Sequence, residues 1–212
     1  MVICIIDTIK EMKMANLKKH IEKMSKSIDK KLGKGKGSEF LDKYKIVAGY
    51  ETPKEVEKWV VSLSKHLEKN IDENKLIEIR EDCACWKNSP VTKKVFFELR
   101  KTYTKDKEYL DAVSEFMTKK GRCGKKVEIN KGEIISYFSD VPLNKHSCAC
   151  GVLKDCDWKT PLSTTTWCRC CCGFIKNVYK NVFPEKICHV DIMETIVTGG
   201  NNCIFRTWFT DE

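Results

Sequence analysis

The stretch ICHVDIMETIVTGGNNCIFRTWF, residues 187–209, decides the fold of the second half of the chain. Two runs rich in β-branched and aromatic residues, 187–197 and 203–209, flank the segment Thr-Gly-Gly-Asn-Asn. Glycine and asparagine tolerate a positive φ, so this segment predicts a hairpin turn between antiparallel strands. Two earlier runs, 126–129 and 133–138, also predict strands. We therefore expect an antiparallel sheet with packed helices in the second half.

Helical patterns dominate the first half. Thr52-Pro53-Lys54-Glu55 is a capping box with proline at the first helical position, which predicts a helix start. Further helical patterns cover residues 91–103 and 107–118, and another, residues 173–183, precedes the hairpin. The expected fold class is α+β, with a helical N-terminal half followed by the sheet.

The first thirty residues carry one apolar stripe at helical spacing, formed by Met14, Leu17, Ile21, Met24 and Ile28. The pattern stops at residues 31–38, where three glycines lower the helix propensity. Two interpretations remain open: the helix packs on its own domain, or it forms the seam of a homodimer, since the spacing also fits heptads. We expect an N-terminal helical extension, residues 1–50, and an α+β cysteine-rich domain, residues 51–212.

Composition restricts the class of protein. The 212 residues carry a net charge of +9, with 33% charged and 42% hydrophobic residues, which favours a soluble globular protein over a disordered or membrane protein. Lysines alternate with acids, as in residues 105–108, so solvated helix faces are expected and nucleic-acid binding is disfavoured. The apolar start, Met1–Ile6, is too short for a signal peptide, and a cytoplasmic location is expected.

Thirteen cysteines, an odd number, are expected to be metal-binding, redox or catalytic groups in a reducing compartment. The pattern Cys-x-Cys occurs three times, and in an extended segment its two side chains point the same way. Two such pairs complete a shell of four sulfurs, which suits zinc or, as the alternative, an iron–sulfur cluster. The predicted ligands are Cys83, Cys85, Cys148, Cys150, Cys168 and Cys170.

The density of cysteines is a stronger signal than their spacing. The common zinc spacing is Cys-x₂₋₄-Cys, and none of the three pairs has it. Seven of the thirteen cysteines, however, fall between Cys148 and Cys172. Metal binding is the first interpretation of this segment, redox chemistry the second, and burial of cysteine as a small apolar side chain the third.

Candidate catalytic residues lie near the same segment. Cys172 directly precedes the helix expected from Gly173, where a helix N-terminus lowers a thiol pKa and activates the nucleophile. His189, Asp191 and Glu194 are candidates to move protons. The structural alternative is that the two carboxylates face solvent or pair across the hairpin.

The tail resembles the closing hairpin of 4-vinyl-reductase-like domains and of L-2-amino-thiazoline-4-carboxylic acid hydrolase-like proteins. The stretch from Trp167 to Phe174 is similar to the cysteine-bearing segment that opens the preceding helix, but Val197 stands where many vinyl-reductase-like domains carry a further cysteine. The resemblance is confined to the C-terminal region. Its matching positions are Asp191, Glu194, Gly199, Gly200, Cys203, Phe205 and Arg206.

The resemblance implies a pocket for a small molecule between sheet and helices, with hydrolysis of a cyclic C–N or C–S bonded ring in one relative. Together with the cysteines, it predicts a metal-binding cytoplasmic protein that acts as a small-molecule hydrolase. The alternatives are a ligand- or metal-sensing module without catalysis, and an iron–sulfur redox protein. We expect a small-molecule partner and no membrane partner.

Overall fold

The computed structural model describes residues 2–44, 52–85, 90–119, 126–130, 132–138 and 161–211, together with residues 148, 150, 152, 153, 156 and 158; for residues 2–16 and 43 only the backbone is described. The helices are α1 (Val2–Leu32), α2 (Lys36–Leu41), α3 (Pro53–Asn70), α4 (Glu73–Asp82), α5 (Pro90–Thr102), α6 (Asp106–Lys119) and α7 (Arg169–Tyr179). Three short 3₁₀ helices are η1 (Asp42–Tyr44), η2 (Thr166–Cys168) and η3 (Ile196–Thr198). The strands are β1 (Lys126–Asn130), β2 (Glu133–Tyr137), β3 (Lys186–Glu194) and β4 (Ile204–Asp211).

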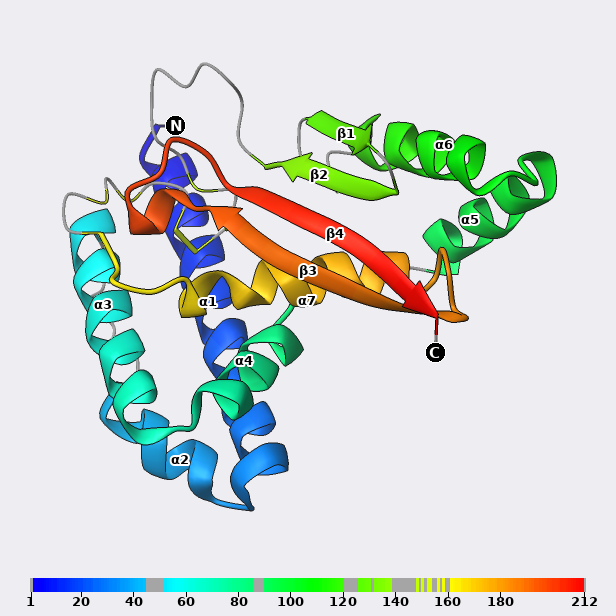
Figure 1. Ribbon diagram of the computed structural model, residues 1–212. Coiled ribbons are helices and arrows are strands. Elements are labelled where there is room, and N and C mark those ends of the chain that lie inside the picture. The colour runs from blue at the N-terminus through cyan, green and yellow to red at the C-terminus, as the bar shows by residue number, and fades with distance from the viewer. Residues whose placement is uncertain are drawn as a thin grey trace.

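The four strands form one antiparallel sheet in the order β1-β2-β4-β3, so the predicted α+β class with a helical N-terminal half is confirmed (Figure 1). The capping box is also confirmed, because Thr52 is the N-cap of α3 and exchanges both hydrogen bonds with Glu55. The strand predicted over residues 187–197 is wrong at its C-terminal end. Residues Ile196–Thr198 form η3, and the backbone N–H of Gly200 donates to the Thr195 carbonyl at 2.9 Å, which turns the chain early.

Successive side chains of the hairpin strands point alternately to an inner face and an outer face of the sheet. On β4, Phe209 packs against Tyr179 of α7, with 5.6 Å between ring centroids, and against Phe183 in the turn after α7. Phe205 packs against Phe138, which in turn contacts Phe174 of α7. Arg206 and Trp208 lie between Phe205 and Phe209 in sequence and therefore point to the outer face. Across the hairpin, Asp191 pairs with Arg206.

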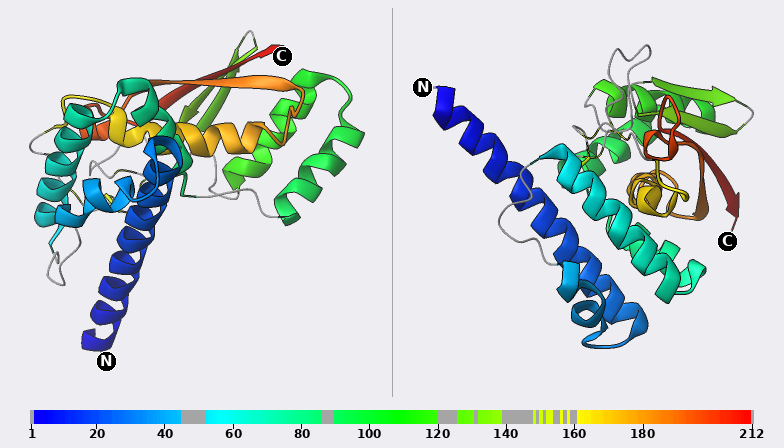
Figure 2. Two further views of the ribbon diagram at one scale, coloured as in Figure 1. Left: turned by 90° about the horizontal axis from the view of Figure 1, so that it is seen from below. Right: turned by 90° about the vertical axis from the view of Figure 1, so that its left-hand side faces the viewer.

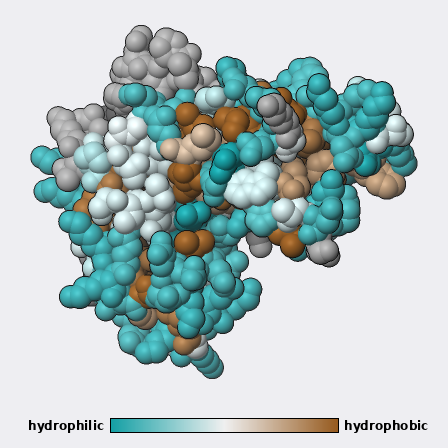
Figure 3. Space-filling view, viewed as in Figure 1, coloured by the Kyte–Doolittle hydropathy of each residue, from teal (hydrophilic) through white to brown (hydrophobic). Residues whose placement is uncertain are grey.

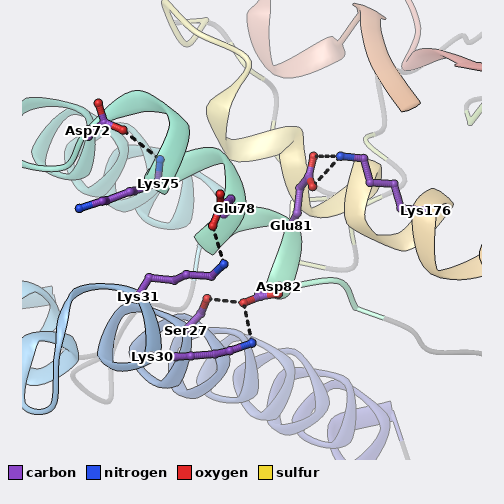
Figure 4. A network of polar contacts seen from close by, with 9 residues as sticks. All are labelled: Ser27, Lys30, Lys31, Asp72, Lys75, Glu78, Glu81, Asp82 and Lys176. Carbon is purple, nitrogen blue, oxygen red and sulfur yellow. Dashed lines mark hydrogen bonds and ion pairs between the residues drawn. The ribbon is translucent and has the colours of Figure 1, made fainter. Parts of the chain in front are cut away.

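The helices stack behind the inner face in the order α7, α4, α1, and the N-terminal end of α1 projects away from the rest of the chain (Figure 2). Gly173 allows α7 to approach α4, because a Cβ at that position would lie 2.0 Å from the backbone oxygen of Glu81. Lys176 of α7 donates to both carboxylate oxygens of Glu81, and Ser27 of α1 donates to Asp82 at 3.0 Å (Figure 4). Polar contacts thus join the three helices.

The apolar stripe of α1 packs on its own chain where its side chains are described. Leu17, Met24 and Ile28 are buried in the same hydrophobic core as residues of α3, α4 and α7. This core joins the range 1–50 to the range 51–212. Pairing of α1 with a second copy stays a prediction.

The surface seen in Figure 3 is mostly hydrophilic over the helices, with hydrophobic residues in small separate patches. Among the described parts of the chain, no helix combines the length and the apolar character needed to cross a membrane.

Candidate functional site

Four segments that are distant in sequence bring cysteines together in the interior. Cys83 and Cys85 follow α4, Cys148 and Cys150 belong to the segment before η2, and a third set begins at Cys168 and opens α7. Cys203 precedes β4. Most of these thiols are buried, whereas Cys85 lies at the exposed edge of the cluster and Cys171 is half-buried.

The first part of the cluster, here named the four-thiol group, consists of Cys85, Cys150, Cys170 and Cys171. Hydrogen bonds from Cys171 and Cys85 hold the pKa of Cys170 well below its usual range, so Cys170 loses its proton more readily than the other members of the group. The same hydrogen bonds raise the pKa values of Cys85 and Cys171. Burial raises the pKa of Cys150 to about 12, and Cys150 interacts electrostatically with the other three members.

The second part, here named the three-thiol group, consists of Cys148, Cys168 and Cys203. A hydrogen bond with Cys203, followed by burial, raises the pKa of Cys148. Burial raises the pKa of Cys168, whereas a hydrogen bond from the Thr195 hydroxyl opposes this effect. The backbone N–H of Cys150 contacts Cys148 Sγ at 3.5 Å, so the two groups are neighbours.

A buried cation lies beside the thiols. Arg80 of α4 is only 1% exposed, and among the described residues no carboxylate forms an ion pair with it. Its guanidinium stacks over Trp167, donates to the Trp167 carbonyl at 2.6 Å and contacts His20 Nε2 at 2.9 Å. Arg80 Nε has no hydrogen-bond partner in the described part of the chain. Burial, and then the Arg80 charge, lower the pKa of His20 to about 4. His20 is therefore neutral at pH 7. The Arg80 charge also lowers the pKa of Cys170, which is the thiol near Arg80 that loses its proton most readily.

A second cation lies at the edge of the cluster. Lys23 of α1 donates to the Ala84 carbonyl at 2.9 Å, between Cys83 and Cys85. Its charge lowers the pKa values of both cysteines, although burial still raises the pKa of Cys83 to about 11. Helices α1 and α4 thus each contribute one cation to the surroundings of the thiols.

The structure gathers the six predicted metal ligands into one region, but in a different local geometry. Cys168 and Arg169 have helical backbone angles, so this pair converges through the first turn of α7 and not through an extended segment. The Cys83 thiol donates to the Ile79 carbonyl of its own helix at 3.2 Å. Within the described part of the chain, no group of three or more His, Cys, Asp or Glu side chains is already arranged around a metal position.

Two cysteines of the cluster were absent from the predicted ligands, Cys171 and Cys203. Within the run Cys170-Cys171-Cys172, Cys171 can be assigned to the cluster only once it is known that α7 begins at Arg169. Cys203 is more than thirty residues from Cys168 in sequence, and the hairpin alone returns it to the cluster. Their own neighbours in sequence do not reveal either position.

The four predicted catalytic residues do not meet in one place. Because α7 begins at Arg169, Cys172 lies inside the helix and not before it, which corrects the expected N-terminal position. Burial raises the pKa of Cys172 to about 12, so the thiol stays protonated at neutral pH. After burial, the charged groups with the largest effect on its pKa are Arg169 and Glu81.

The other three predicted catalytic residues lie on the hairpin and have structural partners. His189 stacks on Trp208 and contacts the Thr210 hydroxyl at 2.9 Å. Asp191 accepts a hydrogen bond from Arg206 at 2.8 Å. Glu194 accepts from the backbone N–H of Asn202 at 2.9 Å and from that of Asn201, which holds the turn. Their catalytic roles stay predictions.

A surface cavity of about 310 Å³ lies where α3, α4 and the start of α7 meet. Arg169, which stands between Cys168 and Cys170, is one of its walls. Apolar and charged side chains both reach it. The cavity is lined by Glu68, Ile71, Glu73, Leu76, Ile77, Thr164, Thr165, Thr166 and Arg169.

Comparison with known proteins gives one match. The model of a family of unknown function, DUF6144, matches residues 12–212. The chain belongs to this family. The DUF6144 match includes α1 from residue 12 onward and the cysteine cluster, so the helical first half and the sheet belong to one family unit. No curated protein and no solved structure matches the chain.

Proposed function

We propose that this protein binds a soft metal ion through the four-thiol group, with zinc as the first choice and an iron–sulfur cluster as the alternative. Thiolate is the preferred ligand of both, and structural zinc sites take four ligands of this kind. Cys85, Cys150, Cys170 and Cys171 come from three separate segments, so a bound ion would join these segments. The metal would contribute directly to folding stability.

The observation that carries this proposal is the buried charge of Arg80, which forms no ion pair with a carboxylate of the described residues. An isolated buried cation costs several kcal/mol unless an anion compensates it. A divalent ion with four thiolates carries two negative charges, and Arg80 and Lys23 together supply two positive charges beside it. The Cys170 thiolate alone would leave this pair of cations only half compensated.

The hydrogen bonds within the group support the same conclusion. With Zn–S bonds of about 2.3 Å, two sulfurs of a tetrahedral site are about 3.8 Å apart. Two thiols that share a hydrogen bond are therefore close to the spacing that the metal requires. Cys170 shares such bonds with both Cys85 and Cys171. Metal binding would replace the shared protons, and affinity would fall as the pH is lowered.

Elemental analysis with an absorption spectrum tests this proposal on protein purified anaerobically without added metal. We expect zinc, or iron with labile sulfide, in the wild-type protein and a clear loss of this metal in Cys170→Ser. Cys188→Ser is the matched control, because Cys188 lies on β3 outside both thiol groups. Protein without metal, or equal metal content in Cys170→Ser and the control, would contradict the proposal.

The need for reduced thiols supports a reducing compartment, and we propose a cytoplasmic location. Fractionation of cells with an antibody against the chain tests this, with the cytosolic fraction as the expected result. Recovery from an oxidising compartment would contradict it.

We propose a small-molecule hydrolase activity as the second candidate function, favoured by the cavity beside Arg169. A cavity with apolar walls and few charged groups is typical of small-molecule sites. Small cyclic C–N or C–S bonded compounds are screened by thermal shift, and ring-opened products are sought by mass spectrometry. Arg169→Gln should reduce both signals. A ligand response that is unchanged in this variant would remove the cavity from the proposal.

A further inference from the structure

We infer that the cavity beside Arg169 binds a small zwitterion, a compound that carries one carboxylate and one ammonium group on a short apolar skeleton, as an apolar amino acid does. The inference rests on the second candidate function only for the position of the site. It requires neither ring hydrolysis nor a metal ion. It names the chemical class of ligand that the cavity takes.

Arg169 forms the positive side of the cavity. It is the first residue of α7, and its half-buried side chain lines the cavity wall. Among the arginines that the structure describes, Arg100 and Arg206 pair with carboxylates, whereas the Arg169 side chain forms no hydrogen bond or ion pair with a described residue. A guanidinium whose fork of donors is unused matches a carboxylate ligand, which it binds through two parallel hydrogen bonds.

Two carboxylates, Glu68 of α3 and Glu73 of α4, form the negative side of the cavity. The Thr164 hydroxyl donates to Oε1 of Glu68, and the Thr166 N–H donates to the Thr164 hydroxyl oxygen at 3.4 Å. These two hydrogen bonds in series orient the Glu68 carboxylate. Only Oε1 takes part in them, so Oε2 of Glu68 can accept from the ammonium group of a ligand.

Apolar side chains line the rest of the cavity. Ile71 and Leu76 are buried, and Ile77 is half-buried. Backbone hydrogen bonds fix the turn that carries them, from Ile71 to the Leu67 carbonyl at 2.9 Å and from Leu76 to the Asp72 carbonyl at 2.8 Å. The volume of about 310 Å³ is at the lower end of the range for ligand pockets, about 300–1,000 Å³. The cavity therefore suits a short apolar skeleton and is already formed before a ligand binds.

The charges of the cavity wall disfavour the simpler classes of ligand. One guanidinium and two carboxylates line the cavity. A ligand with only an anionic group would be repelled by both carboxylates, and a ligand with only a cationic group would be repelled by Arg169. A neutral compound would form an ion pair with neither side. A zwitterion is the class of ligand that pairs with both.

Titration of the full-length chain with L-valine, L-leucine and L-phenylalanine, followed by ligand-observed NMR, tests the inference. Each amino acid has two matched probes, its amide, which lacks the carboxylate, and the acid with the same skeleton but no amino group. We expect at least one of the amino acids to bind. Its affinity should exceed the affinities of its two single-charge probes by at least about tenfold, which corresponds to about 1.4 kcal/mol.

Variants place the binding in this cavity. Arg169→Gln should weaken binding of the amino acid at least about tenfold, and Glu68→Gln should remove its advantage over the acid without an amino group. Arg100→Gln is the matched control, because it removes the same charge from α5, outside the cavity. If Arg169→Gln does not fold, as judged by circular dichroism, Arg169→Lys takes its place. It keeps the charge but loses the fork of donors, so binding should weaken several-fold.

The outcomes distinguish this inference from the proposed function. An amino acid that binds through Arg169, with no ring-opened product from any cyclic compound, would support the inference and count against the hydrolase. A neutral cyclic compound that binds through Arg169 while no amino acid binds would overturn the inference and leave the hydrolase intact. Equal affinity for the amino acid and a single-charge probe, or unchanged binding in a folded Arg169 variant, would also overturn it. Metal content, measured on the same samples, tests the four-thiol site independently.

Discussion

The inner and outer faces of the β3–β4 sheet differ in how their chemically active side chains are satisfied. On the outer face, Asp191 pairs with Arg206, and His189 stacks on Trp208. Behind the inner face and α7, Arg80 is buried, and no carboxylate among the residues that the structure describes pairs with it. Both regions carry residue types that suit catalysis or binding. The comparison shows that a buried charged side chain without a carboxylate partner distinguishes the candidate site from the outer face, where the charged side chains form ion pairs.

Replacement of the two arginines gives the largest expected difference between these regions. Arg80→Met should lower the free energy of unfolding of the metal-loaded protein by about 3–5 kcal/mol, because a buried anionic centre loses its counter-charge. Arg206→Met should cost less than about 1 kcal/mol, because its ion pair is half-exposed. Denaturant unfolding of both variants measures this. Equal costs would contradict the distinction between the faces.

The close approach of α7 to α4 should also be sensitive to substitution. Gly173→Ala would place its Cβ 2.0 Å from the Glu81 backbone oxygen, so the helices must separate, at a cost of about 3 kcal/mol. Gly132→Ala is the control, since its Cβ meets no atom within 4 Å and only its φ of 85° is strained, at about 1 kcal/mol. We also expect metal loss in Gly173→Ala alone. A well-folded Gly173→Ala variant with full metal content would refute this account of the α4–α7 contact.

His20 should make the inner region sensitive to acid. Its pKa falls to about 4 in the folded chain from an ordinary value of 6.5, so the unfolded chain binds the proton first as the pH decreases. The stability that neutral His20 contributes is complete above pH 6.5 and is lost towards pH 4, with about 2 kcal/mol lost between pH 7.5 and pH 5. In His20→Gln, the free energy of unfolding should fall by about 2 kcal/mol less over this pH range. Equal acid sensitivity in urea unfolding of both proteins would count against a buried neutral His20.

The smallest effect is expected on the outer face. Asp191→Asn removes an ion pair in which both side chains are more than a third exposed, so the free energy of unfolding should change by less than about 1 kcal/mol. Metal content should be unchanged. Calorimetry and elemental analysis measure both quantities. Metal loss, or a cost above about 2 kcal/mol, would mean that the outer face takes part in the site.

Local sequence patterns predicted the helices and strands, but they failed where contacts between distant residues set the boundary of an element. The capping box at Thr52 and the hairpin follow from short-range rules, and the structure confirms both. The predicted start of α7, residue 173, is four residues too late, because the apolar helical spacing begins only at Phe174, whereas the cysteine run before it already forms the first turn. This shift changes the position assigned to Cys172 in the helix. Gly173 serves the contact with Glu81.

The cysteine region was predictable from density, but the grouping of the thiols was not. Cys148 to Cys172 are dense in the sequence, whereas Cys203 joins them only through the hairpin, and Arg80 only through the packing of α4 on α7. Arg80 carries no sequence signal, since an arginine on a charged helix is usually exposed. The packing of distant segments therefore determines which thiols lie together and where Arg80 lies, and the composition of the sequence does not reveal either.

X-ray absorption spectroscopy at the metal edge, on protein purified anaerobically, tests the central claim most directly. The proposal predicts a bound metal with a first shell dominated by sulfur, at about 2.3 Å for zinc. In Cys170→Ser, the intensity of the sulfur shell or the metal content should fall. A metal held mainly by oxygen or nitrogen, or protein that holds no metal in its reduced form, would contradict a thiolate centre beside Arg80.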